Sequence, residues 1–150
     1  MKLVLFDIDG TLISDGGSSR EAFSIALEEI YGYRGDVRRF DFSGRTDPQI
    51  AHMVLSDAGL SERQIDAEMP RLWERYIEEM ERRAVTRSRE LPGVRALLEA
   101  LQSNARVVLG LLTGNIERGA RLKLAGPGFN EFFSFGAFGS DSPRREQQAF

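Results

Sequence analysis

The chain opens with a short apolar run that ends abruptly in two carboxylates. Residues 2–12 read K-L-V-L-F-D-I-D-G-T-L, so an apolar segment from Leu3 to Phe6 leads directly into Asp7 and Asp9. A continuous apolar run closed by a turn signal is typical of a strand buried on both faces. Ligands bind at the carboxyl ends of such strands in open parallel sheets. We therefore expect the two carboxylates at a site, as metal ligand, nucleophile or acid/base, although ordinary strand-end turns also use Asp.

A second apolar run with a polar end follows later in the chain. Residues 105–112 read A-R-V-V-L-G-L-L and are closed by Thr113, Gly114 and Asn115. This ending alone also fits a plain strand-to-helix turn with Asn115 as the N-cap. The two segments together resemble the haloacid dehalogenase-like hydrolase superfamily, whose first motif is D-x-D-G-T and whose second is a strand ending in Thr or Ser. The resemblance spans essentially the whole chain.

The resemblance implies an α/β fold, with a Rossmann-like parallel sheet core and an inserted α-helical cap of the phosphoglycolate phosphatase-like kind. The stretch between the two apolar runs has helical patterns throughout. Helices are expected from a capping box at Ser18 to about Tyr31, from an N-cap at Asp47 to Gly59, and from Ser61 onward, with Pro70 kinking or dividing the last. We expect residues 1–15 and 88–150 to form the core and residues 16–87 the cap, hinged near 15–17 and 85–91.

The rest of the predicted core is incomplete by comparison with the family. Its expected elements are a helix from Pro92 to Gln102, a helix over 117–125, a strand over 132–138 and a helix beginning at Arg144. The family completes its metal site with a later acidic pair, which nothing after Phe138 supplies. The C-terminal part of the core is thus missing from the pattern, which leaves Leu3–Phe6 on an open sheet edge. A fragment of a longer enzyme is the favoured interpretation; a second chain that supplies the strands, or a relative that binds without turnover, are the others.

Site roles follow from the resemblance. Asp7 is implied as the nucleophile that forms an aspartyl-phosphate, and Asp9 as the acid and base for the leaving oxygen and the attacking water. Thr113, with Gly114 and Asn115, is implied to bind the substrate phosphate. Mg²⁺ is the implied cofactor, held by the Asp7 carboxylate and the Asp9 backbone carbonyl, an arrangement that suits its preference for few protein carboxylates.

A positive group near the transferring phosphoryl is also expected. Lys123 is the favoured candidate, because lysine is the usual point charge for this task; the alternatives are Arg144 or Arg145, or a solvated role for Lys123. Arg45 lies in a polar turn at a helix start, where anions are favoured, and is the candidate contact for a substrate carboxylate or phosphate. A plain surface arginine is an equally good interpretation of it.

These residues predict a Mg²⁺-dependent phosphomonoester hydrolase acting on a small phosphorylated metabolite. Superfamily dehalogenases usually lack an acid at the place of Asp9, and phosphonate hydrolysis needs a cap lysine that this chain does not have. A sugar-phosphate mutase stays open, because its core motifs are the same. A non-catalytic phosphometabolite-binding protein or subunit also stays open, because the fourth acidic motif is absent.

Composition and charge limit the classes of partner that we expect this chain to bind. The formal net charge of −3 provides no basic face for nucleic acid, and the absence of cysteine excludes disulfides and thiolate zinc sites. No apolar run has membrane-spanning length, and no signal peptide precedes the first strand, so a cytoplasmic protein without membrane partners is expected. The exposed first strand makes self-association an expected liability.

Overall fold

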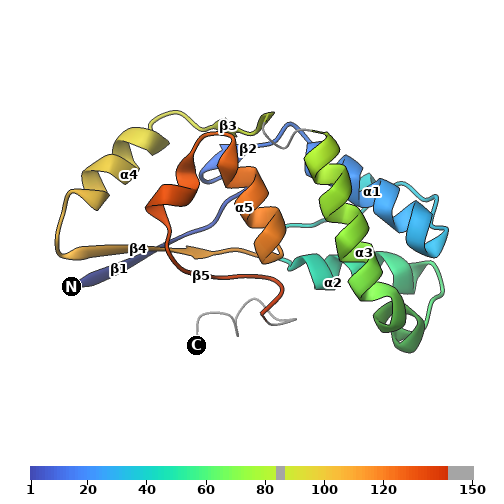
Figure 1. Cartoon of the computed structure of the whole chain (residues 1–150). Helices are drawn as coiled ribbons and strands as arrows, with labels where there is room; N and C mark the ends of the chain where they lie inside the picture. The colour runs from blue at the N-terminus through green and yellow to red at the C-terminus, as the bar shows by residue number, and fades with distance from the viewer. Residues whose placement is uncertain (84–86, 142–150) are drawn as a thin grey trace.

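A computed structural model of the protein describes residues 1–83 and 87–141. Its central sheet has three parallel strands in the order β1 (Lys2–Phe6), β4 (Val107–Leu112) and β5 (Gly136–Ala137). Helices α4 (Val94–Gln102) and α5 (Glu117–Ala125) lie on one side of this sheet (Figure 1). Parallel strands joined by crossover helices form a Rossmann-like core, which confirms the predicted α/β class.

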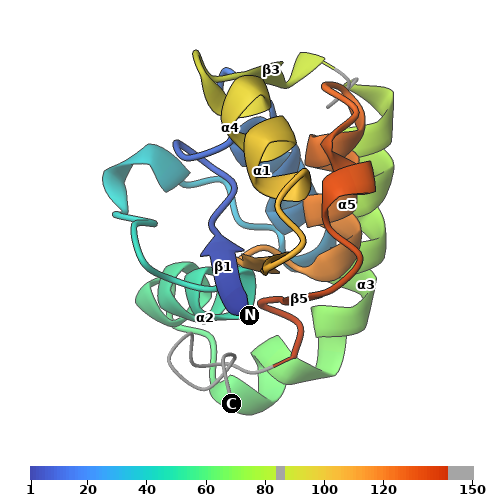
Figure 2. The same cartoon turned by 90° about the vertical axis from the view of Figure 1, so that its left-hand side faces the viewer.

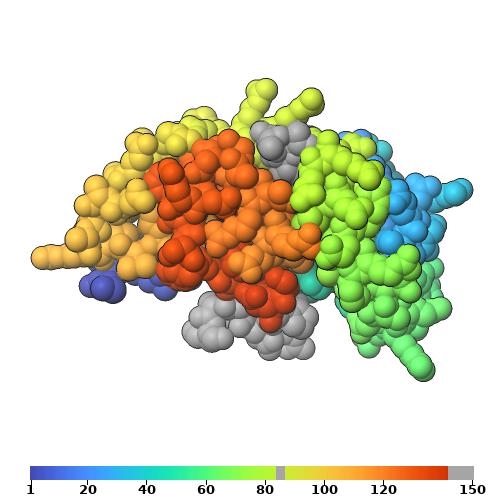
Figure 3. Space-filling view, viewed as in Figure 1, coloured from blue at the N-terminus to red at the C-terminus, as the bar shows by residue number. Residues whose placement is uncertain are grey.

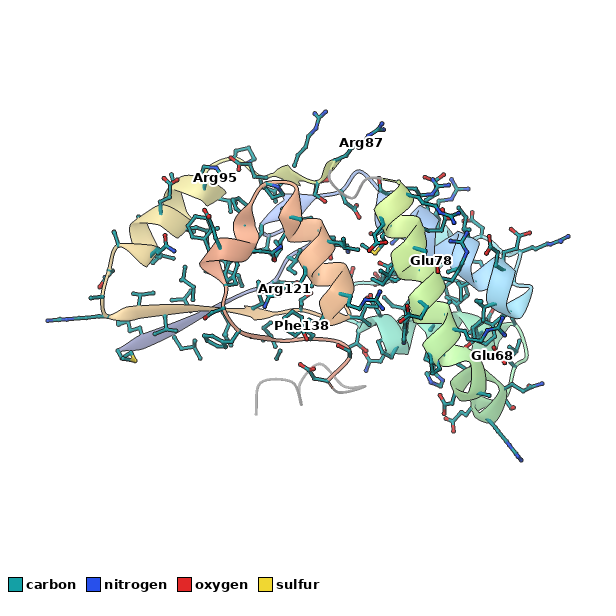
Figure 4. All side chains as sticks on the ribbon, viewed as in Figure 1. Glu68, Glu78, Arg87, Arg95, Arg121 and Phe138 are labelled. Carbon is teal, nitrogen blue, oxygen red and sulfur yellow. The ribbon has the colours of Figure 1, made fainter. Side chains whose placement is uncertain are left out.

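The hydrophobic core of this part fills the space between the sheet and its helices. It includes the buried side chains of Ile8, Leu98, Leu111, Leu124, Phe129 and Phe133. Phe138 follows β5, and Arg121 on α5 holds its guanidinium carbon 5.5 Å from the Phe138 ring centroid (Figure 4). Arg121 also donates to the backbone oxygen of Phe133 at 2.8 Å, so α5 is tied to the segment around β5.

β1 is an edge strand, and the expectation that it is buried on both faces is wrong. Val4 and Phe6 pack against the core, whereas Leu3 and Leu5 on the opposite face are 57% and 40% exposed. The reason is that β1 pairs with β4 alone within the described residues, and that α4 and α5 cover one face. The open edge at Leu3–Phe6 is as expected; self-association through it stays a prediction.

The expected third strand is shorter than the sequence suggests. A 3-10 helix occupies Phe129–Phe132, and β5 covers two residues, Gly136–Ala137. Alternation misleads here because the 3-10 helix sends Phe129, Phe132 and the following Phe133 into one core. The helix expected from Arg144 lies outside the described residues.

Three helices form the second part of the chain. They are α1 (Ser18–Tyr31), α2 (Asp47–Asp57) and α3 (Glu62–Arg82), with a 3-10 turn at Val37–Arg39. Their apolar faces meet in a separate cluster that includes Phe23, Leu27, Val54, Ile65, Leu72 and Met80. α3 is continuous through Pro70, so that proline does not divide it.

Two helix starts differ from the sequence-based expectation. The capping box at Ser18 is absent; instead the Asp15 carboxylate accepts from the backbone N–H groups of Gly17 (2.9 Å) and Ser19 (3.1 Å). The N-cap of α2 is Thr46, which forms the capping box with Gln49. Asp47 is therefore the first helical residue, and its carboxylate is available for another contact.

The chain passes twice between the sheet and the helical part, and the two connecting segments pair with each other. β2 (Ile13–Ser14) and β3 (Arg89–Glu90) form an antiparallel ladder, and Leu91 N donates to Leu12 O at 3.0 Å. In Figures 1 and 2 the N-terminus lies at the end of the molecule away from α1 and α3, so β1 runs toward the helical part. The domain limits at residues 15 and 88 stay a prediction.

Contacts also join the two parts over one face of the molecule. The surfaces of α3 and α5 lie side by side (Figure 3), and Arg118 on α5 pairs with Glu74 on α3 at 2.6 Å. Among the described helices, none is both long and apolar enough for a membrane crossing.

The capping box of α3 provides a test of local stability. Ser61 accepts from Gln64 N at 3.3 Å, and Gln64 Oε1 accepts from Ser61 N at 2.9 Å. Ser61→Ala should lower the free energy of unfolding by about 1 kcal/mol, because a helix donor loses its partner. Urea unfolding measures this, with Ser56→Ala, an exposed position within α2, as the matched control. Equal stability of the two variants would contradict the capping role.

Candidate active site

A cavity of about 520 Å³ lies where β1 and β4 end against the helical part. All seven site residues singled out from the sequence line it: Asp7, Asp9, Arg45, Thr113, Gly114, Asn115 and Lys123. The segments that follow β1 and β4 supply five of them, α5 supplies Lys123, and Arg45 comes from the loop before α2. Parallel strands bring their carboxyl ends to one sheet edge, so the fold itself gathers residues that are up to 116 positions apart.

Asp7 and Asp9 point to the cavity while the residue between them does not. Ile8 lies in the bend after β1 and is fully buried in the core. Asp7 Oδ1 accepts from Ile8 N at 2.9 Å. Gly10 then turns the chain with a φ of 73° and donates to Ile13 O at 2.9 Å. The tight turn keeps both carboxylates on the lining of the cavity.

Lys123 is buried against Asp9 and is not a solvated helix lysine. Its Nζ donates to Asp9 Oδ1 at 2.9 Å, Asp9 Oδ2 at 3.0 Å and Asn115 Oδ1 at 2.7 Å. Burial works to lower the pKa of Lys123, but the carboxylates of Asp9, Asp47 and Asp15 outweigh it and raise the pKa. The ammonium therefore stays charged. Arg144 and Arg145, the alternative cations, lie outside the described residues.

Asn115 connects the other polar groups. Its Nδ2 donates to Asp9 Oδ2 at 2.8 Å and to Thr113 Oγ1 at 2.7 Å, while its Oδ1 accepts from Lys123. Ile116 occupies the N-cap position of α5, so the interpretation of Asn115 as a helix cap is wrong. The same amide thus holds the ends of β1 and β4 and the α5 ammonium in one network.

The glycine of the T-G-N segment permits a close approach by the helical part. A Cβ at Gly114 would lie 2.2 Å from the carbonyl oxygen of Arg45 and 3.1 Å from Thr46 Cα. On the other side, a Cβ at Gly139 would lie 2.0 Å from the oxygen of Gly114. Backbone is therefore packed on both sides of Gly114, and any larger residue there requires a shift of main chain.

Asp47 fastens this contact, a place in the site that was not predicted from the sequence. Its backbone N donates to Gly114 O at 2.7 Å, and its Oδ2 accepts from Ile116 N at 2.8 Å. The available signal was that Thr46 and Asp47 are adjacent N-cap formers, of which one alone can cap a helix. The spare carboxylate caps the start of α5 from another part of the chain.

The charge of Asp47 is set by its surroundings. Burial raises the pKa of Asp47 to about 6, opposed by Lys123 and by the hydrogen bond from Ile116, and assisted by Asp9. Asp15 lies in the same cavity; burial works to raise its pKa, but hydrogen bonds from Ser19 and the charge of Lys123 lower it. The charge of Lys123 thus acts to lower the pKa of both Asp47 and Asp15.

The oxygen groups present suit magnesium in part. Mg²⁺ is bound through one or two protein carboxylates plus waters and substrate oxygens, a donor set that Asp7 and the Asp9 carbonyl match. Within residues 1–83 and 87–141 no group of three or more His, Cys, Asp or Glu residues is placed to hold a metal ion.

A family profile described as haloacid dehalogenase-like hydrolase matches residues 1–147. The chain belongs to this family. No curated protein matches it.

Solved structures agree with the family at the level of the fold. The chain is 20% identical to a predicted phosphoglycolate phosphatase from Haemophilus somnus 129PT (TM-score 0.66), covering 96% of this chain and 65% of that one. It is 22% identical to a hydrolase from Pseudomonas syringae (TM-score 0.68; 95% and 62%). It is 19% identical to a beta-phosphoglucomutase from Clostridium difficile (TM-score 0.67; 92% and 61%). This haloacid dehalogenase-like chain therefore spans less than two thirds of the length of these three structures.

Asp47 makes stability depend on pH in a testable way. Its folded pKa of about 6 lies above the ordinary 3.8, so ionisation costs more in the folded state. Stability from this carboxyl is greatest below about pH 4 and falls as pH rises to about 6, by at most about 3 kcal/mol. Urea unfolding of wild type and Asp47→Asn tests this. As the pH rises over this range, the free energy of unfolding of wild type should fall relative to that of Asp47→Asn. A pH-independent difference would contradict the assignment.

Proposed function

We propose that the protein is a Mg²⁺-dependent phosphomonoester hydrolase that acts on a small phosphorylated metabolite through an aspartyl-phosphate intermediate. The supporting observation is that Asp7 and Asp9 line the same cavity as Thr113 and the buried ammonium of Lys123. Membership of the hydrolase family gives this arrangement its reaction class. A cytoplasmic location and the phosphoglycolate phosphatase-like branch belong to the same proposal.

In the first step, an Asp7 carboxylate oxygen forms a bond to phosphorus. The bond from phosphorus to the leaving oxygen breaks, and that oxygen takes the electron pair together with a proton from Asp9, which enters this step protonated, with one oxygen turned from Lys123 to the leaving group. In the second step, Asp9 removes a proton from water, whose oxygen attacks the same phosphorus. Phosphate leaves and the Asp7 carboxylate is restored. The exposed part of Asp9, 47% of its side chain, gives water and leaving group access to it.

The remaining groups bind and orient the phosphoryl. Lys123 places a fixed positive charge beside Asp9, and the Thr113–Asn115 turn holds the phosphate next to Asp7. The Asp7 carboxylate and the Asp9 backbone carbonyl would hold Mg²⁺, which when bound neutralises charge between the anionic nucleophile and the phosphate. Arg45 from the helical part contacts the rest of the substrate.

A sugar-phosphate mutase is the second candidate. The likeness to the beta-phosphoglucomutase of Clostridium difficile favours it at the level of the fold. A mutase uses the same aspartyl-phosphate but passes the phosphoryl to a sugar hydroxyl instead of water. Release of inorganic phosphate from a simple aryl ester therefore favours the hydrolase.

Hydrolysis of p-nitrophenyl phosphate tests the proposal. We expect turnover with Mg²⁺, loss of it with EDTA, and a loss of at least about a thousandfold in kcat for Asp7→Asn, which lacks the nucleophile. Asp57→Asn, an exposed carboxylate at the end of α2, is the control and should keep wild-type rates. A folded chain that binds phosphate but releases none from the ester would favour the binding-protein alternative.

Lys123 can be tested against a second lysine. Lys123→Met should lower kcat/KM by about a hundredfold, because the charge beside the transferring phosphoryl is lost. Lys123→Arg should recover little of this, since a planar guanidinium is larger than the ammonium that bonds to Asp9 and Asn115 and directs its donors differently. Lys2→Met is the matched control, because Lys2 is the chain's other lysine and is exposed at the start of β1. A Lys123→Met rate within threefold of wild type would contradict the role.

A further inference from the structure

The cavity has two chemically different ends. Its core end carries the polar groups described above. Its other end, formed by α1, the loop before α2, α2 and α3, is lined by Arg20, Phe23, Phe42, Arg45, Ile50 and Tyr76. A phosphoryl group bound at the core end leaves this second end to the rest of the substrate. At about 520 Å³ the cavity has room for a small organic ligand and not just for a phosphate.

The apolar side chains of the second end hold one another in place. The Phe23 ring packs edge-to-face on Phe42, with centroids 6.2 Å apart, and on Tyr76, with centroids 5.9 Å apart. Phe23 and Tyr76 are 5% and 4% exposed, so the helical core fixes the positions of their rings. Burial, and then the charges of Asp47, Asp9 and Asp15, raise the pKa of Tyr76, so its ring belongs to this end and its hydroxyl to the boundary with the core end. Such a preformed apolar wall favours a flat or compact apolar group, which is stabilised by the area it buries.

Arg20 adds a charge to this wall. Its guanidinium carbon lies 4.4 Å from the Phe42 ring centroid, a cation–π contact that fixes the head group. Within the described residues, Arg20 makes no ion pair with a carboxylate. A half-buried arginine that lines a cavity in this way presents its donors to an incoming anion.

Arg45 lies near Arg20, and they share a single neighbouring acid. Arg45 Nε donates to the backbone oxygen of Asp41 at 3.2 Å. The pKa of the Asp41 carboxyl is lowered first by hydrogen bonds from Ser43 and then by the charges of Arg45 and Arg20. Two arginines thus act on one neighbouring carboxylate, and both line this end of the cavity. The core end, in contrast, carries the carboxylates of Asp7, Asp9, Asp15 and Asp47.

We propose that the substrate is a phosphomonoester whose leaving group has a flat or compact apolar part and ends in a second anion, bound by Arg20 together with Arg45. The proposal rests on the proposed hydrolase function, because it assigns the phosphoryl to the core end. A carboxylate and a second phosphate share the required chemistry. The core end already holds the phosphoryl beside several carboxylates, so a second anion is better placed at the other end, beside Arg20 and Arg45.

A matched pair of esters tests the second anion. Phenyl phosphate and 4-carboxyphenyl phosphate differ by one carboxylate. We expect wild type to favour the carboxylated ester by at least tenfold in kcat/KM, and Arg20→Gln to reduce this ratio at least tenfold, since a charge-assisted hydrogen bond is lost. Arg34→Gln, an exposed cap arginine paired with Glu28, should keep the wild-type ratio. A wild-type ratio near one, or a ratio that Arg20→Gln leaves unchanged, would overturn the proposal.

Two further ligands refine the result. The bisphosphate of benzene-1,4-diol replaces the carboxylate by a phosphate, and the better of the two doubly anionic esters identifies the class of the second anion. Phosphoglycolate has an anionic tail without a ring. Phe42→Leu should lower kcat/KM for 4-carboxyphenyl phosphate several-fold more than for phosphoglycolate; equal losses would overturn the apolar part of the proposal.

Binding measurements separate this inference from the hydrolase function. 4-Phosphonobenzoate and phenylphosphonate are not cleaved, and calorimetry compares their Kd values for wild type and Arg20→Gln. Failure of every ester to turn over would contradict the hydrolase function alone, while a Kd ratio of at least tenfold that collapses in Arg20→Gln would still support the anion site. Equal Kd values for the two phosphonates in wild type would overturn it.

Discussion

The ion pair between Lys123 and Asp9 is the interaction on which the site depends. A buried ammonium is costly unless it is paired and hydrogen-bonded. Here Lys123 meets both Asp9 oxygens and the Asn115 carbonyl oxygen, so its charge is compensated from β1 and from the end of β4. Removal of the Asp9 carboxylate would leave the buried ammonium with the Asn115 amide oxygen and without this charged partner. The free-energy cost of an unpaired buried ammonium therefore favours one arrangement of Lys123, Asp9 and Asn115.

The helical part depends on a different constraint, the close approach of two backbones at Gly114. No side chain fits between Gly114 and the Arg45 carbonyl, and Asp47 bonds to both sides of that turn. The loop that supplies Arg45 is thereby held against the loop that supplies Thr113 and Asn115. The positions of these two loops are therefore fixed relative to each other.

Much of the fold could be predicted because it depends on local patterns. The helix over Glu117–Ala125 was predicted to the residue, since apolar spacing and the following glycine-proline turn are encoded next to each other. The burial of β1 could not be predicted, because a strand's neighbours are chosen by the whole sheet. The pairing of the linkers β2 and β3 was not predicted either, because a strand of two residues is too short to show a periodic pattern.

The sequence by itself determined which residues could do chemistry: two carboxylates after one strand, a T-G-N turn after another, and a lysine on the next helix. Tertiary structure alone decided how they are used. Asn115 lies at the centre of a hydrogen-bond network and does not cap a helix. Asp47 is not the N-cap of α2, and its carboxylate bonds to Ile116 in another loop. The physical reason is that hydrogen bonds and ion pairs between distant segments are decided by proximity and desolvation, which arise after the chain has packed.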